Sequence, residues 1–244
     1  MSQPPAFVAP RVVLIDHTKD PDLVCAAAAK ICYEPEEWQR ESGKFLDFEG
    51  MLAWLRDERP DHVAKVLRFA LGQEPPHESI VEHAHFTFYF EGVSRSLLAQ
   101  LTRHRIASYT IQSQRYVDLQ DATFVTPPAI ARNPQAAAEY AKVMEEIWHS
   151  YDRLRALKVG KQDARYVLPN ACTTRGVVTF NARSLLNFFD LRLDRHAQWE
   201  IRYLANEMLR LVKPVAALLF ERVEVLPVEA IIAQPGSIAT GDES

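Results

Sequence analysis

The sequence contains few cysteines and few glycines. Its three cysteines include no CxxC pair and leave an odd number, so reduced thiols in a cytoplasmic protein are the simplest interpretation. Only eight glycines occur among 244 residues, and neither the dinucleotide-binding nor the P-loop glycine motif is present. A large cofactor would therefore be bound mainly by side chains and helix ends.

Long apolar runs and an excess of positive charge are also missing. No apolar run reaches the roughly 20 residues that a membrane-spanning helix needs, and the N-terminus lacks the basic region and apolar core of a secretory signal. The formal net charge of −4 argues against broad nucleic-acid binding, which normally requires a basic face. A small anionic ligand needs only a few arginines. We therefore expect neither membrane nor nucleic-acid partners.

The hydrophobic patterns predict one α+β domain over residues 1–244, with a small mixed or antiparallel sheet flanked by long helices. The two ends, 1–9 and 233–244, are polar or contain proline and glycine, so we expect them to be flexible. Strands are predicted at 11–16, 84–92 and 176–181. Helices are predicted at 20–33, 46–57, 60–72, 94–104 and 134–158, from about 183, and from about 196 to 221.

The strand predicted at 84–92 has the clearest pattern. Phe86, Phe88 and Phe90 alternate with His85, Thr87 and Tyr89. Because successive side chains of a strand point to opposite faces, we expect the three phenylalanines on a buried face.

The stretch RHRIASYTIQSQRY, residues 103–116, concentrates cationic groups in an acidic chain. If the preceding helix continues to its predicted end, Gln100, Arg103 and His104 share one face at i, i+3 and i+4. These side chains could bind an anionic ligand. The alternative is a solvated helix end whose cations complement the helix dipole.

The rest of this stretch resembles a loop that enters a strand at 115–116. Ser113 and Arg115 could hold a phosphate there, together with backbone N–H groups. Ser113 could also act as a nucleophile with His104 as its base, but no third orienting group is evident.

A second group of polar residues lies in HESIVEHAHF, residues 77–86. His83 and His85 could share a strand face and bind a metal. No HExxH helix or cysteine supports such a site, so we expect no metal. Ordinary hydrogen bonds and contacts with an organic cofactor are the remaining interpretations.

A third group lies in NARSLLNFFDLRLDRHAQWE, residues 181–200. Arg183 and Asn187 are spaced i, i+4 on one helical face, and His196 has the same spacing to Glu200. Buried polar groups without partners cost about 1–3 kcal/mol each. We therefore expect these side chains either to pair with neighbouring aspartates or to bind a ligand rich in acceptors.

Taken together and in this order, these segments resemble the flavin-dependent thymidylate synthase family. RHRIASYTIQS fits the family signature of RHR, seven residues and a serine. HESIVEHAHFTF is similar to its cofactor-binding histidine segment, and NARSLLNFFDLRLDRHAQWEI is similar to its long C-terminal block. The resemblance covers roughly 77–221 and, more faintly, 11–33.

The resemblance implies an FAD-dependent methyltransferase that converts deoxyuridylate (dUMP) to thymidylate (dTMP). The one-carbon donor would be 5,10-methylenetetrahydrofolate, and FAD would carry hydride from NADPH. No enzymic nucleophile is needed in this chemistry. The resemblance also implies a homotetramer whose active sites draw on several subunits.

Site residues follow from the same resemblance. The positions implied to bind FAD are His77, Ser79, Arg103, His104, Arg105, Asn181, Arg183, Asn187 and His196. The positions implied to bind dUMP are Gln100, Arg103, Ser113, Gln114, Arg115, Arg165 and Arg192. Arg192 is the implied catalytic residue, because an arginine beside the uracil ring favours its ionised, more nucleophilic form.

The chain departs from the family pattern at one point. The family often has Asn-Glu where this chain has Thr110 and Ile111, and the Ile111 side chain cannot accept a hydrogen bond. Gln112 or the backbone would have to make that contact. Two other functions stay open: a flavin- and folate-dependent uracil methyltransferase acting on RNA, and a non-catalytic nucleotide- or flavin-binding protein.

Overall fold

The computed structural model describes residues 10–32, 47–116 and 123–233. Four strands form one antiparallel sheet in the order β1-β2-β4-β3. They are β1 Arg11–His17, β2 His85–Ser94, β3 Ser108–Ile111 and β4 Thr173–Asn181. The predicted α+β class is confirmed, and the sheet is antiparallel.

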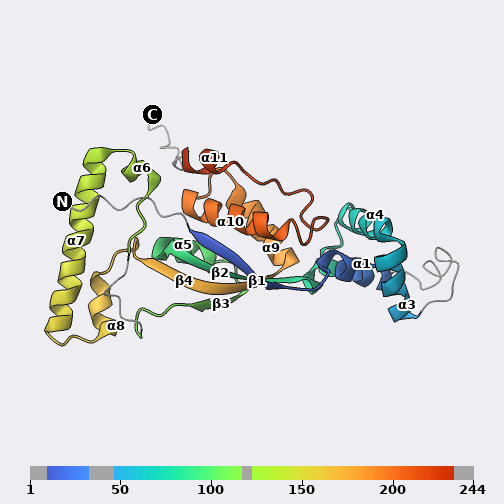
Figure 1. The fold of residues 1–244 in the computed structure, drawn as a ribbon, viewed down its shortest axis with the longest axis horizontal. Helices are drawn as coiled ribbons and strands as arrows, with labels where there is room; N and C mark the ends of the chain where they lie inside the picture. The colour runs from blue at the N-terminus through green and yellow to red at the C-terminus, as the bar shows by residue number, and fades with distance from the viewer. Residues whose placement is uncertain (1–9, 33–46, 117–122, 234–244) are drawn as a thin grey trace.

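Helices surround this sheet. The α-helices are α1 Pro21–Ile31, α3 Phe48–Ala53, α4 Pro60–Leu71, α5 Arg95–Leu101, α6 Pro128–Ala131, α7 Pro134–Ala156, α8 Lys161–Ala164, α9 Ala182–Leu193, α10 Trp199–Val212 and α11 Val228–Ala233. One π-helix, η1 Trp54–Glu58, and two 3-10 helices, η2 Glu78–His83 and η3 Arg165–Val167, complete the set among the described residues. In Figure 1, α9 and α10 lie over the sheet, α1, α3 and α4 lie at one end, and α7 and α8 lie at the other.

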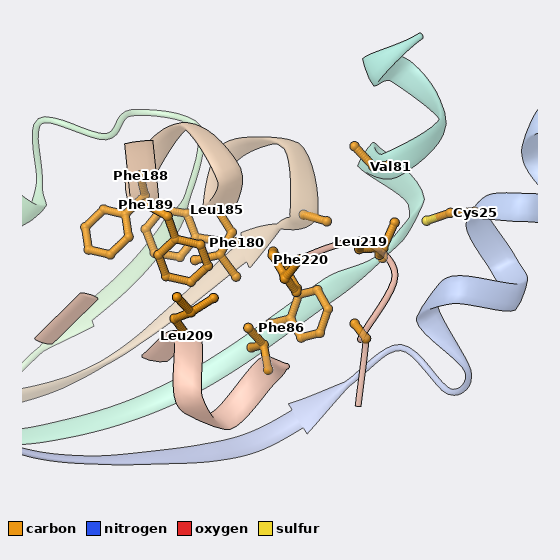
Figure 2. Packing of buried hydrophobic residues seen from close by; sticks show 14 of the residues in the cluster. Cys25, Val81, Phe86, Phe180, Leu185, Phe188, Phe189, Leu209, Leu219 and Phe220 are labelled. Atoms are coloured by element: carbon orange, nitrogen blue, oxygen red, sulfur yellow. The ribbon is translucent and has the colours of Figure 1, made fainter. Parts of the chain in front are cut away.

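One face of the sheet forms the centre of the hydrophobic core. Phe86, Phe88 and Phe90 of β2 are fully buried, as their alternation predicts. They pack with residues of β4, α9 and α10 in one cluster. Figure 2 shows Phe86, Phe180, Phe188, Phe189 and Phe220 of this cluster gathered close together. Burial of these rings is the main stabilising contribution, since each removes a large apolar area from water.

Two strand-to-helix junctions place the helices that carry the polar motifs. The side chain of Ser94, at the end of β2, accepts a hydrogen bond from the Leu97 N–H and caps α5. Asn181, at the end of β4, caps α9 in the same way through the Ser184 N–H. Because β2 and β4 are antiparallel, the two helices begin at opposite ends of the sheet.

Several predicted boundaries are wrong. The last long helix, α10, ends at Val212 instead of 221, because Pro214 lacks an N–H and its ring clashes with a carbonyl one turn earlier. The strand near the RHR stretch is β3, Ser108–Ile111, and 115–116 form a turn. The termini expected to be flexible lie outside the described residues, apart from Ala233 at the end of α11.

No helix of the described ranges is long and apolar enough to cross a membrane.

Ile111 is a packing residue of the sheet. It pairs with Gly176 of β4, and its side chain is partly buried against the hydrophobic core. A Cβ atom at Gly176 would lie 2.6 Å from Ile111 Cδ1 and 2.7 Å from the Thr110 carbonyl oxygen. The isoleucine therefore fills space above a residue that has no side chain, and this accounts for an apolar side chain at this position.

We expect Gly176→Ala to destabilise the protein by about 1–3 kcal/mol, the usual cost of overpacking. The methyl group would push β3 away from β4, since one of the contacts is with a backbone oxygen. Urea unfolding measures the change. Gly160→Ala is the matched control, because a Cβ there meets nothing within 4 Å. Equal unfolding midpoints for the two variants would contradict the prediction.

Candidate active site

A cavity of about 1230 Å³ opens beside α9. Its walls come from η2, from the turn that follows α5, from α9 and from the segment after α10. Of the residues predicted to be functional, it is lined by Arg103, His104, Arg105, Asn181, Arg183, Asn187 and Arg192. Glu78 and Glu82 of the 77–86 segment also line it, so the structure brings together side chains from all three sequence segments.

The RHR residues do not lie on a helix, so the predicted common face of Gln100, Arg103 and His104 is wrong. α5 ends at Leu101, and the His104 N–H donates to the Leu101 carbonyl in a tighter i→i−3 turn. The same carbonyl also accepts a hydrogen bond from the Tyr109 hydroxyl, at 2.9 Å. Since that oxygen would accept from the Arg105 N–H in a continued helix, Tyr109 favours the end of the helix at this point.

Tyr109 fixes the turn that presents the three RHR side chains. Its hydroxyl donates to the carbonyl oxygens of both Leu101 and His104. Burial raises the pKa of Tyr109 to about 12. The hydroxyl therefore remains protonated and able to donate over the whole physiological pH range.

Tyr109→Phe should lower the free energy of unfolding by about 1 kcal/mol, the usual contribution of a hydrogen bond, and should weaken ligand binding in the cavity. Tyr140→Phe is a suitable control, because its hydroxyl donates to the Val125 carbonyl away from the residues that line the cavity. Urea unfolding and a binding titration of both variants test this. A Tyr109 variant that binds FAD and dUMP as tightly as the control would contradict it.

His104 and Arg192 are in direct contact. The Arg192 Nε donates to His104 Nε2 at 2.9 Å, and its Nη2 donates to the Gln100 carbonyl at 3.2 Å. His104 is buried, and its ring meets the Phe188 ring edge-on at 4.9 Å between centroids. Burial, and secondly the charge of Arg192, lowers the pKa of His104 to about 4. At neutral pH, His104 is therefore an uncharged acceptor and not a cation.

The arginines of the cavity differ in how their charges are balanced. Arg183 is paired with Glu78 and Glu82 of η2, at 3.1 and 2.6 Å. In the described part of the chain, Arg103 and Arg192 have no carboxylate partner. Burial, and secondly the charge of Arg103, lowers the pKa of Arg192. Two nearby cations without a counter-ion make this part of the cavity suited to an anion.

A second set of predicted residues lies at the other end of the sheet. The turn after β3 begins at Gln112, whose N–H donates to the Arg175 carbonyl at the start of β4. The cavity lies at the other end of β4, at Asn181. Six residues of strand separate the two points, about 20 Å at about 3.3 Å per residue. The residues of this set are Ser113, Gln114, Arg115 and Arg165, and none lines the cavity.

Local contacts organise this second set. Ser113 Oγ accepts a hydrogen bond from the Arg115 N–H at 3.1 Å. Arg165 Nε donates to the Gln162 carbonyl, whereas the buried Gln114 Nε2 has no hydrogen-bond partner among the described residues. Ser113 does not line the cavity that contains His104, so a nucleophile–base pair within one chain has no support.

The remaining predicted residues border the cavity or lie outside it. His77 and Ser79 are exposed on either side of Glu78, which does line it. His196 is exposed and bonds Asp194, with 2.9 Å between Nδ1 and Oδ1. It does not pair with Glu200 as predicted, because that buried carboxylate accepts from the N–H and hydroxyl of Ser94.

Some cavity residues carry no signal in the sequence. Arg222, Glu224 and Leu226 line it from the segment after α10, where no motif marks them. Glu78 and Glu82 also line the cavity, where they form ion pairs with Arg183. These pairs could not be predicted from the sequence, because Arg183 is 101 or more positions away. Within the described ranges, no three His, Cys, Asp or Glu side chains gather as a metal site.

Comparison with known proteins assigns the family. The family model described as thymidylate synthase complementing protein matches residues 13–217. The flavin-dependent thymidylate synthase of Clostridium tetani is 42% identical over 227 residues, covering 86% of this chain and 85% of that protein. Those of Nitratidesulfovibrio vulgaris and Pyrococcus furiosus are 40% identical over 223 residues and 42% identical over 203 residues. The match with the Nitratidesulfovibrio vulgaris protein covers 86% of this chain and 85% of that protein. The match with the Pyrococcus furiosus protein covers 82% of this chain and 77% of that protein. The family model and these relatives match most of the chain, and the cavity contains the arginines of the sequence motifs. The chain therefore belongs to the flavin-dependent thymidylate synthase family.

Proposed function

We propose that this protein methylates dUMP to dTMP with 5,10-methylenetetrahydrofolate as one-carbon donor, and that FAD carries hydride from NADPH. The family and the names of its relatives support the overall reaction. The observation that supports it most directly is Arg192. Its guanidinium is half-buried in the cavity wall and has no carboxylate partner among the described residues.

The cavity residues fit a flavin dinucleotide. The volume of about 1230 Å³ exceeds the roughly 300–1,000 Å³ usual for drug-sized ligands. Arg103 and Arg105 can donate to a diphosphate, and the carboxamide of Asn187 can donate to and accept from polar groups of the cofactor. When bound, FAD supplies the hydride-transfer chemistry that side chains lack.

Arg192 has the role of stabilising negative charge on the uracil ring. A fixed cation beside the ring favours the ionised form, which makes the carbon to be methylated more nucleophilic. The partly buried position strengthens this interaction, because the local dielectric constant is lower than in water. No serine or cysteine has to attack the substrate in this scheme.

The second set of residues leads us to propose a homotetramer with shared active sites. The resemblance implies that Ser113, Gln114, Arg115 and Arg165 bind dUMP, with Ser113 to Arg115 near its phosphate, yet none of them lines the cavity of the same chain. The turn that carries Ser113 to Arg115 begins about 20 Å along the sheet from Asn181. A neighbouring subunit could bring its own copies of these residues to the cavity. Size-exclusion chromatography with light scattering tests the assembly.

The visible absorption spectrum of the purified, desalted protein is the first test. We expect flavin bands that bleach anaerobically with NADPH, faster when dUMP is present. Formation of dTMP from free dUMP then separates the synthase from an RNA methyltransferase and from a non-catalytic binder. A colourless protein that takes up no added FAD would refute the redox scheme.

A further inference from the structure

Arg192 can act on a uracil ring only if its guanidinium is held in one orientation. Arginine side chains have many accessible rotamers, so a free guanidinium at the cavity wall would sample many positions. We propose that His104 is a positioning residue, which orients Arg192 toward the nucleotide by accepting its Nε–H bond on a neutral imidazole. This inference rests on the proposed function.

The hydrogen bond fixes the tautomer of His104. Arginine has five N–H donors and no acceptor, so in the 2.9 Å contact Arg192 Nε donates and His104 Nε2 accepts. The ring proton of His104 is therefore on Nδ1. A protonated imidazole would place two hydrogen atoms and two positive charges against each other, and the contact would be lost.

His104 is itself held by two backbone hydrogen bonds and by one ring contact. The His104 backbone N–H donates to Leu101, and its carbonyl accepts from the Tyr109 hydroxyl at 2.8 Å. The ring meets Phe188 of α9 edge-on, and only 8% of the residue is exposed. Because its backbone and its ring are both constrained, His104 can hold the Arg192 guanidinium in one defined position.

Two hydrogen bonds determine which edge of the guanidinium faces a ligand. Nε and Nη2 share one edge of the planar group, and these atoms donate to His104 and to the Gln100 carbonyl. Neither bond uses Nη1. The end of the group, formed by the two Nη atoms, keeps unused N–H donors on a residue that lines the cavity, and it can donate to two acceptors at once. A uracil ring with its carbonyl oxygens offers acceptors of this kind.

The charge of the surroundings agrees with this role. Burial and the neighbouring Arg192 charge keep the imidazole neutral at pH 7. Arg103 adds a second cation close to Arg192, which further disfavours protonation of the ring. The group that contacts Arg192 is thus an acceptor without charge, so it orients the guanidinium and leaves its positive charge unneutralised for the substrate.

The test compares variants of the FAD-loaded protein. His104→Phe keeps an aromatic ring against Phe188 but cannot accept a hydrogen bond, whereas His104→Gln keeps an acceptor. We expect His104→Phe to weaken dUMP binding by roughly tenfold, measured by isothermal titration calorimetry, since side chains in direct contact are usually energetically coupled. His104→Gln should recover most of the affinity. His149→Phe, on an exposed site of α7, is the matched control and should bind dUMP like the wild type.

A double-mutant cycle separates positioning from a general structural role. In an Arg192→Ala background, adding His104→Phe should change dUMP affinity by less than about twofold, because the side chain to be oriented is gone. An equal loss in both backgrounds would overturn the inference, as would a Gln variant as weak as the Phe variant. If His104→Phe does not fold, His104→Leu replaces it in the cycle.

The wild type distinguishes a failure of the proposed function. If the wild-type protein binds neither FAD nor dUMP, the proposed function and the inference fail together, before any variant is compared. If the wild type binds both and the cycle shows no coupling, only the role of His104 is wrong.

Discussion

Arg192→Ala should reduce turnover by roughly a thousandfold while FAD stays bound. Removal of one positioned group that stabilises transition-state charge typically costs a factor of about 10²–10³, and loss of a full positive charge at a half-buried position belongs at the upper end. FAD should remain because the other cavity arginines and asparagines are unchanged. Anaerobic rates of dTMP formation and the flavin spectrum of the same sample measure both effects.

Arg195→Ala is the matched control for this experiment. Arg195 lies three residues further along the chain, is exposed and does not line the cavity. We expect Arg195→Ala to keep nearly all turnover. That result would show that the loss of one positive charge does not by itself explain the inactivity of Arg192→Ala. If Arg192→Ala instead loses FAD completely, the division of roles between Arg192 and the other cavity residues is wrong.

Phe188→Ala should destabilise the protein by about 3–5 kcal/mol, the usual cost of removing a fully buried aromatic side chain. Phe188 is completely buried and contacts the rings of Phe180, at 5.4 Å, and Phe189, at 5.9 Å between centroids. For a chain of this size, such a loss lowers the melting temperature by about 10 °C. Differential scanning calorimetry measures the change.

Phe188 also supports the ring of His104, so this substitution should affect the site as well as the core. Phe188→Leu is the control, because it keeps most of the apolar volume and should cost only about a third as much. A melting temperature of Phe188→Ala within 2 or 3 °C of the leucine variant (roughly one kcal/mol) would show that the core relaxes into the space.

Sequence patterns predicted the parts of the fold with strong local signals. The alternation of Phe86, Phe88 and Phe90 gave the central strand and its buried face, and Pro60 marked the start of α4. β3 was missed because only four residues form it, and its stability comes from pairing with β4. The end of α5 depends on Tyr109, which lies eight positions after Leu101. Tertiary contacts of this kind are not visible in local periodicity.

The candidate site was predicted in part. Arg183 and Asn187 share one face of α9, as their i, i+4 spacing predicts. Arg192 lies roughly 180° around the helix from Arg183, so spacing alone does not predict that it lines the same cavity. His104 was expected to be a cation, whereas its burial and its contact with Arg192 make it neutral. Spacing could not show this, because the partner is 88 positions away. The wall residues near 222–226 were missed for the same reason.

The cavity walls come from segments of the chain that are far apart in the sequence, so a ligand there can bind only the folded chain. Binding and folding are consequently linked. A ligand present at 100 times its Kd adds about 2.7 kcal/mol to the free energy of unfolding, a large part of the 5–15 kcal/mol typical of a domain. We therefore expect the supply of the cofactor to change the abundance of the protein as well as its activity, because a chain without ligand unfolds and is proteolysed more often.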